Sequence, residues 1–338
     1  MKNEGFLMGM GLLRNFFAVL GALVLTICPL GENAFAQTYP IKPITLVVPF
    51  SASGPTDTVA HLIAGPMGKD LGQEIHIENI AGDGGTIGTL RVARAAPDGY
   101  VILINHIGMA TAPALYKKLP YDPLKDFEYI GQAVDVPMVL LGRKNLPPNN
   151  LKELESYIKS NKTHVTIANA GQGAVSQLCG LLFMSREGVE LTSIPYHGTA
   201  PALTDLLGGQ VDLLCDQTTQ VGPYIQKNLV KAYGVTTPAR LSSLPNIPTL
   251  QEQGLKGFEI EAWIGLYAPK GTPTAVIAKL NKALRSALNN PAVKTRLAES
   301  NIEIAPMSKV TPASLKQHLE SEINRWGPII RNAGAYAE

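Results

Sequence analysis

Short apolar runs rich in β-branched residues alternate along the chain with helical stretches, and glycine, serine, asparagine or aspartate stands at most of the joints. Such runs are typical of buried strands, so the alternation predicts βα units and mostly parallel sheets. In the first part of the chain, the expected strands are 44–48, 75–78 and 101–105, and the expected helices are 56–71 and 86–96.

The second part of the chain repeats this rhythm after an irregular stretch at 116–132 and an apolar strand at 137–141. The expected helices there are 151–160, 174–184 and 201–207, and the expected strands are 165–168, 191–194, 211–215 and 230–235. An apolar strand at 263–268 then returns to the first series, and helices starting after Thr272 and Thr311 cover its sheet. We therefore expect two doubly wound α/β lobes joined by two crossing strands, with lobe 1 at 37–140 plus 262–338 and lobe 2 at 141–261.

The first thirty-six residues have the pattern of a secretory signal peptide. Lys2 and Arg14 form a basic beginning, 16–27 is an uncharged apolar run, and Ala34 and Ala36 flank Phe35 in a small-x-small cleavage site. The apolar run is too short for a stop-transfer helix, although an uncleaved anchor is the alternative. We expect cleavage after Ala36 and a periplasmic protein.

Composition excludes some classes of partner and leaves the state of the cysteines open. The formal net charge of the 338 residues is +2, so nothing in it calls for a nucleic acid or a membrane surface. Removal of the signal peptide takes Cys28 and leaves Cys179 and Cys215. In an oxidising compartment this pair is either a disulfide or two buried thiols that pack as small apolar residues.

A glycine-rich loop at 79–89 raises the question of nucleotide binding, because glycines between a strand and a helix often hold phosphate. Its spacing is G-x-G-G-x-x-G, with Ile87 where the dinucleotide fingerprint needs a third glycine, and Asn105 rather than an acid ends the next strand. There is also no Walker motif, no H-E-x-x-H or C-x-x-C metal pattern and no G-x-S-x-G elbow. We therefore expect neither cofactor nor metal, and an enzyme that uses Ser53 or His197 is a weakly supported alternative.

Four loops between a strand and the start of a helix carry the candidate chemistry, at 50–57, 81–88, 169–173 and 196–199. The carboxyl edge of a parallel sheet collects such loops, so two from each lobe face one cleft. Helix N-termini favour an anion, and His197 is the one basic candidate in these loops, since they contain no Arg or Lys. A carboxylate, held by N–H and hydroxyl groups alone, suits the loops better than a highly charged phosphate.

Six ordered blocks of sequence resemble a known family over essentially the whole mature length. They are YPIKPITLVVPFSASGPTDTVA, NIAGDGGTIGTLRVARAAPDGY, LYKKLPYDPLKDFEYIG, IPYHGTAPALTDLLGGQVDLLCDQ, RLSSLPNIPTLQEQG and WIGLYAPKGTP. The chain resembles the solute receptors of tripartite tricarboxylate transporters, also called Bug proteins. The resemblance implies a fold like that of type II periplasmic binding proteins, and delivery of a small carboxylate to a membrane permease without a cofactor.

The resemblance also implies a set of ligand-binding positions and a role for several of them. Asp57 takes the position of a recurrent aspartate that caps a helix, and Asp216 and Gln217 are expected to read the type of ligand at the far end of the pocket. A disulfide between Cys179 and Cys215 would stiffen the second-lobe wall. The expected ligand-binding residues are Phe50, Ser51, Ser53, Thr56, Gly84, Gly85, Asn169, Gly171, Gly173, Ala174, Thr199, Asp216 and Gln217.

The sequence departs from the family pattern at the rim of the expected pocket. Ala52-Ser53-Gly54 replaces the usual Pro-Gly-Gly, His61 stands where arginine is common, and His197 replaces a lysine. We expect a monomeric periplasmic solute-binding protein that closes around a mono- or dicarboxylate, aliphatic or aromatic, and hands it to permease subunits. A receptor that presents its closed form to a membrane sensor kinase is the alternative.

Overall fold

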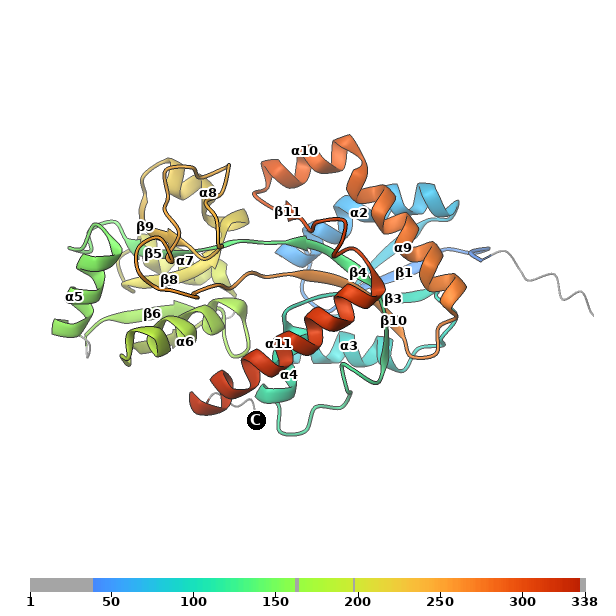
Figure 1. Ribbon diagram of the computed structural model, residues 1–338, viewed down its shortest axis with the longest axis horizontal. Helices are drawn as coiled ribbons and strands as arrows, with labels where there is room; N and C mark the ends of the chain where they lie inside the picture. The colour runs from blue at the N-terminus through green and yellow to red at the C-terminus, as the bar shows by residue number, and fades with distance from the viewer. Residues whose placement is uncertain (1–38, 162–163, 197, 335–338) are drawn as a thin grey trace, which may run out of the picture. The chain divides into compact units, whose positions relative to one another are not determined.

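The computed structural model describes residues 39–161, 164–196 and 198–334 (Figure 1). The expected signal peptide at 1–36 and His197 lie outside the described residues. From Lys42 onward the chain forms one compact unit. No helix in the described ranges is long and apolar enough to span a bilayer.

The first sheet is built mainly from the N-terminal part of the chain. Its strands, from one edge to the other, are β11 (Glu303–Ile304), β4 (Phe127–Asp135), β10 (Ile264–Pro269), β3 (Val101–His106), β1 (Ile44–Val48) and β2 (Ile75–Asn79). Strands β1, β2 and β3 run parallel, whereas β10 is antiparallel to both of its neighbours. The central strands are apolar on both sides, as in a sheet covered on both faces.

Helices cover both faces of the first sheet (Figure 1). On one face α2 (Pro55–Leu71) packs against α9 (Thr274–Asn289) and α10 (Pro291–Glu299). On the other face α11 (Pro312–Asn332) packs against α4 (Gly108–Leu115), near α3 (Thr86–Ala93). The apolar stripe of α11 is buried except at Ile323, which is half-buried. Its buried members are Leu315, Leu319, Trp326 and Ile330.

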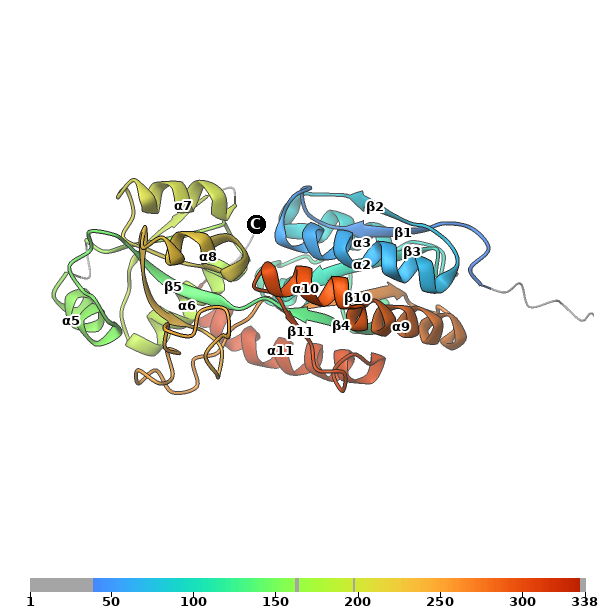
Figure 2. The same ribbon diagram turned by 90° about the horizontal axis from the view of Figure 1, so that it is seen from above.

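The second sheet has the same arrangement with different strands. Its order is β7 (Thr192–Pro195), β6 (Thr166–Asn169), β8 (Leu213–Gln217), β5 (Met138–Arg143) and β9 (Val230–Val235). The helices of this part are α5 (Leu151–Asn161), α6 (Val175–Glu187), α7 (Thr199–Leu207) and α8 (Thr218–Gln226). Figure 2 shows α7 and α8 beside each other, and α6 lies against β6 and β8.

In each sheet one antiparallel strand arrives from the other half of the chain. Strand β10 enters the first sheet between β3 and β4, and β5 enters the second sheet between β8 and β9. The fold is therefore the expected pair of doubly wound α/β lobes, and a crossing strand forms an inner strand of each sheet. Since β5 pairs along its whole length in the second sheet, the expected lobe boundary after residue 140 falls inside this strand. The exact boundaries of the lobes stay a prediction.

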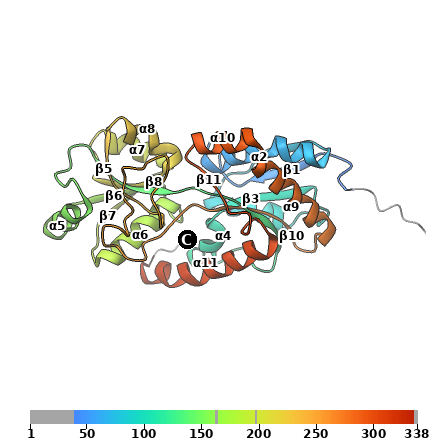
Figure 3. The same cartoon turned by 45° about the horizontal axis from the view of Figure 1, so that its top comes forward.

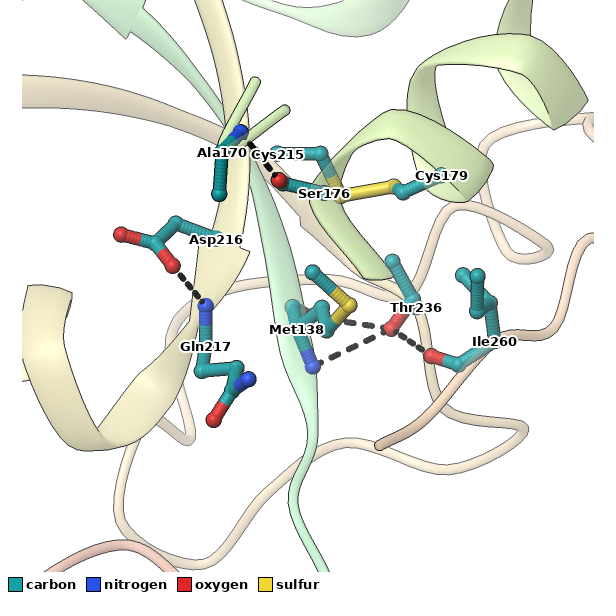
Figure 4. The surroundings of a disulfide bond; sticks show 9 residues. All are labelled: Met138, Ala170, Ser176, Cys179, Cys215, Asp216, Gln217, Thr236 and Ile260. Carbon is teal, nitrogen blue, oxygen red and sulfur yellow. Dashed lines mark hydrogen bonds between the residues drawn. A yellow bond between two sulfur atoms is a disulfide. The ribbon is translucent and has the colours of Figure 1, made fainter. Parts of the chain in front are cut away.

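Hydrogen bonds tie the two crossing segments to each other. Val136 and Ala262 exchange backbone hydrogen bonds, at 3.2 Å from Val136 N–H and 3.0 Å from Ala262 N–H. The buried Thr236 hydroxyl donates to the carbonyl of Ile260 at 2.6 Å and accepts from Met138 N–H at 3.2 Å, as Figure 4 shows. The crossings therefore form a short paired ribbon rather than two independent linkers.

The sequence-based assignment was wrong or incomplete at several elements. The stretch at 116–132 is not irregular throughout, because β4 begins at Phe127. Helices α4 and α8 were missed, and each contains an internal proline, Pro113 or Pro223, of the kind that normally ends a helix. Helix α10 was also missed, although Asn290 caps its start with a side chain that accepts from Ala292 and Val293.

The disulfide between Cys179 and Cys215 is present, with Cα atoms 6.1 Å apart. It joins α6 to β8, and both cysteines are fully buried (Figure 4). The sequence left open a disulfide or two buried thiols, and the structure contains the disulfide. It holds the end of β8, which carries Asp216, against α6, which carries Ser176.

Removing this disulfide is expected to destabilise the protein substantially. The bridge closes a loop between residues 36 apart, and loop-closure entropy predicts a loss of roughly 2–4 kcal/mol in the free energy of unfolding for Cys179→Ala/Cys215→Ala. Urea denaturation of the non-reduced mature protein and of the double variant measures the difference. Two titratable thiols in the denatured, unreduced wild type would contradict the assignment.

Acidic side chains gather where the chain crosses between the lobes. Asp135 ends β4, and Glu261 lies in the second crossing segment, where it forms a β-bridge with Pro137. Burial raises the pKa of Asp135 to about 6 and the pKa of Glu261 to about 8. For Glu261, the negative charges of Asp135, Glu303 and Glu259 add to this shift, and Lys309 opposes it.

This cluster predicts that the crossing loses stability as the pH rises. A raised pKa means that the folded state holds the Glu261 proton more tightly than the unfolded chain, so the stabilisation present below pH 4.5 is lost by about pH 8. We expect Glu261→Gln to match the wild-type melting temperature near pH 4 and to exceed it at pH 8. Exposed Glu299→Gln is the control, and equal pH profiles for wild type and Glu261→Gln would refute the prediction.

Candidate functional site

A cavity of about 290 Å³ lies at the carboxyl ends of the parallel strands of both sheets. The loops after β1, β6 and β8 and the starts of α2, α6 and α7 supply most of its wall. The lining residues are Phe50, Gly54, Pro55, Thr56, Gly84, His106, Met138, Ala170, Gln172, Gly173, Ala174, Val175, Ser176, Gly198, Thr199, Asp216 and Gln217.

Many of the residues expected to bind ligand line this cavity. They are Phe50, Thr56, Gly84, Gly173, Ala174, Thr199, Asp216 and Gln217. The other expected residues are not among the lining residues, namely Ser51, Ser53, Gly85, Asn169 and Gly171. Asn169, for example, donates to Ser193 Oγ at 2.8 Å and accepts from Gly171 N–H at 2.9 Å, so it fixes the loop.

Sequence reasoning missed several lining residues. His106 ends β3, so the same edge rule that selected the four loops could have found it. Ser176 and Val175 lie in the first turn of α6, just beyond the loop that was selected. Met138 begins the antiparallel β5 and pairs with Gln217, and no pattern in the sequence gives this register.

Helices α2, α6 and α7 begin at the cavity without a side-chain cap. Their N-cap residues are Gly54, Ala174 and Gly198. At these three helix ends, no described side chain accepts a capping hydrogen bond from the first turn. Away from the cavity, Thr311 caps α11 through its hydroxyl, whereas α9 begins at Pro273 without a side-chain cap. The first N–H groups of a helix have no partner within the helix, so the uncapped ends can serve an anion.

In the glycine loop after β6, the N–H groups of Ala170, Gly171 and Gly173 already donate within the protein. Ala170 N–H donates to Ser176 Oγ at 2.8 Å, and Gly173 N–H donates to Gln177 Oε1 at 2.6 Å. Together with the Gly171 bond to Asn169, these bonds hold the loop in shape. The N–H groups of the first turn of α6 remain as donors at this side of the cavity.

Asp57 shapes the corresponding turn in the first lobe. Its carboxylate accepts from Ser53 N–H at 2.7 Å and from Asn79 Nδ2 at 2.9 Å, and it is not among the lining residues. Ser53 has a φ of +66°, in the left-handed region that favours glycine. The bond to Asp57 therefore holds a conformation for which the family pattern has glycine.

His106 is a neutral donor or acceptor at the cavity wall. Its ring stacks on Phe50 with centroids 4.4 Å apart, and its Nδ1 accepts from Gly108 N–H at 2.9 Å. Burial lowers the pKa of His106 to about 4, so the imidazole is uncharged near neutral pH. With Nδ1 accepting, the ring proton belongs on Nε2.

Asp216 and Gln217 line the cavity, and each has one buried oxygen without a hydrogen-bond partner among the described residues. Asp216 Oδ1 accepts from Gln217 N–H at 2.7 Å, whereas Asp216 Oδ2 and Gln217 Oε1 are buried and unpaired within the described part of the chain. Burial raises the pKa of Asp216 to about 7. The carboxyl group is therefore poised between its neutral and ionised forms at physiological pH.

The described lining contains no Lys or Arg, and the described residues contain no group of His, Cys, Asp and Glu that could hold a metal ion. A family model described as "Tripartite tricarboxylate transporter family receptor" matches residues 59–335. The chain belongs to this receptor family. The resemblance seen in the six sequence blocks is therefore confirmed, and the family is one of periplasmic binding proteins.

Relatives of this receptor support the same assignment. A protein of Agrobacterium vitis described as "UPF0065 protein in the TAR-I ttuE-ttuC' intergenic region" is 46% identical, covering 94% of this chain and 91% of its own. The structure of the periplasmic binding protein BugD is 47% identical with a TM-score of 0.80, covering 88% and 100%. MatC from Rhodopseudomonas palustris, solved with bound malate, is 43% identical with a TM-score of 0.79, covering 86% and 100%. These homologues are binding proteins rather than enzymes.

The glycine-rich loop of the receptor has a packing role that mutation can test. A Cβ on Gly88 would lie 2.7 Å from the Ile80 carbonyl oxygen and 2.8 Å from Pro49 Cα, so α3 could no longer pack closely on the strand ends. We expect Gly88→Ala to lower the free energy of unfolding by roughly 1–3 kcal/mol.

Gly65→Ala is the matched helical control for this variant. No atom lies within 4 Å of a Cβ built there, and the following Pro66 offsets the usual gain in helix propensity. We expect a change within about 0.5 kcal/mol for this control. Equal unfolding midpoints in urea for the two variants would show that the close approach at Gly88 does not matter.

Proposed function

We propose that this receptor captures a small carboxylate in the cavity and delivers it to the membrane permease of a tripartite tricarboxylate transporter. The observation that supports the proposal is the meeting of uncapped helix N-termini at a cavity whose described lining has no Lys or Arg. Partial positive charge from these helix ends favours an anion. The absence of side-chain cations from this lining disfavours a polyphosphate.

The energetics of such a site suit a scavenging receptor. Hydrogen bonds to a charged group contribute roughly 1.5–3 kcal/mol each. Micromolar affinity requires about 8 kcal/mol, so three or four bonds to a carboxylate suffice once apolar contacts offset part of the cost of association. The Phe50 and His106 rings offer such contacts.

The size of the cavity indicates a small ligand. About 290 Å³ lies at the lower end of ligand pockets, which run from roughly 300 to 1,000 Å³. The malate bound by MatC is a ligand of this scale, and we carry its chemical class, a small carboxylate, to this receptor. A mono- or dicarboxylate of a few carbon atoms is the proposed ligand.

The remaining parts of the proposal concern export and assembly. The sequence pattern supports cleavage after Ala36 and release into the periplasm. We propose that the receptor binds without a cofactor, catalyses no reaction and acts as a monomer that meets the permease subunits. Ester hydrolysis by the purified protein would contradict the non-enzymatic part of this proposal.

Matched carboxylates and amides provide the direct test. An N–H-lined site loses charge-assisted bonds with an amide, so di- and monocarboxylates should raise the melting temperature while the corresponding amides should not. Native mass spectrometry of the purified protein identifies any retained ligand. Equal stabilisation by acids and amides would refute the anion site.

A variant that supplies its own anion adds a second arm to this test. Ala174→Asp places a carboxylate at the N-cap of α6, where it can accept from the first turn. We expect ligand-free Ala174→Asp to melt at or above the wild-type temperature and to lose carboxylate binding by at least tenfold. Ala174→Gly, which adds no acceptor, should keep binding within a few-fold of wild type.

A further inference from the structure

A second cavity lies directly beside the cavity proposed to hold the carboxylate. This outer cavity is lined by the starts of α2, α7 and α8 and by the end of α10, which lies next to α8 (Figure 2). Its volume of about 620 Å³ is about twice the 290 Å³ of the ligand cavity. Pro55 lines both cavities, so they share a wall at the first turn of α2.

A hydrogen bond between α7 and α8 continues this shared wall. Thr199 begins α7 and lines the ligand cavity, whereas Gln220 lies in the first turn of α8 and lines the outer cavity. The Thr199 hydroxyl donates to Gln220 Oε1. The next residue of α7, Ala200, already belongs to the outer cavity. The Thr199–Gln220 pair is therefore a partition between the two cavities.

The partition depends on a single contact. Both side chains are half-buried, and within the described part of the chain the bond from Thr199 is the one hydrogen bond of the Gln220 side chain. A glutamine side chain without that bond can adopt other rotamers with no change in the helix that carries it. The length of the ligand cavity on this side is thus set by side chains and not by the backbone.

The outer cavity suits an uncharged group. Glu299 is the one charged side chain in its described lining, and this residue is exposed. Leu203 and Tyr224 contribute apolar surface, and the buried Thr219 hydroxyl oxygen has no partner among the described residues. A carboxylate there would meet a negative charge and no cation, so the cavity favours an uncharged tail.

We propose that the Thr199–Gln220 partition limits the length of ligand that this receptor accepts, and that Gln220 is the specificity residue that keeps long uncharged tails out of the outer cavity. This inference rests on the proposed function, because it assumes that the helix ends hold the carboxylate in the ligand cavity. With the partition in place, a ligand has to fit the smaller cavity. Without it, a tail extends into the outer cavity.

Two series of acids that differ in tail length test this inference. One series is butyrate, hexanoate and octanoate, and the other is succinate, butylsuccinate and hexylsuccinate, so a mono- and a dicarboxylate are both covered. In each series whose shortest member binds, calorimetry of the wild type should give at least tenfold weaker binding to the longest member. If the purified protein retains another carboxylate, that acid and its alkyl derivatives form the series.

Shortening Gln220 should relax the limit. Gln220→Ala removes the outer half of the partition, so the ratio of the affinities for the shortest and longest acids should fall at least fivefold in at least one series. Gln220→Glu keeps both the length and an acceptor for the Thr199 hydroxyl, so its ratio should stay within about threefold of wild type. Gln226→Ala makes the same substitution at the exposed end of α8 and is the matched control.

The ratio of affinities separates the partition from a general loss of binding, because a loss shared by all ligands cancels. Melting of the ligand-free variants reports their folding, and Thr199→Ala, which removes the inner half of the partition, covers the case that Gln220→Ala does not fold. If the wild type binds the longest acids as tightly as the shortest, or if Gln220→Ala keeps the wild-type ratio in both series, the inference fails while the proposed function stands. If no carboxylate of any kind binds the wild type, both fail.

Discussion

The proposed function places one electrostatic constraint on the fold, which is that backbone N–H groups have to hold the anion. Helix ends left uncapped at Gly54, Ala174 and Gly198 carry partial charge but cannot move independently of their helices. A flexible lysine would tolerate a misplaced ligand, whereas a helix end does not. The loops and crossing segments that orient the helices therefore have to place the helix-end N–H groups accurately.

Several features of the two lobes serve this aim. Asp57 fixes the turn before α2, Ser176 and Gln177 hold the loop before α6, and the disulfide joins α6 to the strand that carries Asp216. Hydrogen bonds join the two crossing segments, and α11 packs against both α4 and α6 (Figure 3). These contacts link the supports of the two lobes. The N–H groups of each loop thus form hydrogen bonds within the protein. These bonds fix the direction of the free N–H groups at the helix ends.

The alternation of apolar runs was enough to predict most parallel strands, because each is a short β-branched segment between turn residues. It failed at α4 and α8, where tertiary packing overrides internal prolines, and at β4, whose partners lie far along the chain. At the site, His106 was accessible to reasoning from strand ends. Met138 and the occupied N–H groups of the glycine loop were not, because register and side-chain acceptors are set by tertiary contacts.

The glycine-rich loop shows why a phosphate-like motif can belong to a receptor of this family. Gly84 reaches the cavity, Gly85 allows the Phe50 ring to approach, and Gly88 lets α3 pack on Pro49. Each glycine thus permits a close contact, and none supplies charge. At many phosphate sites, Lys or Arg side chains add charge-assisted hydrogen bonds to such backbone contacts. Without such side chains in its described lining, the cavity suits the small carboxylate proposed as its ligand better than a phosphate.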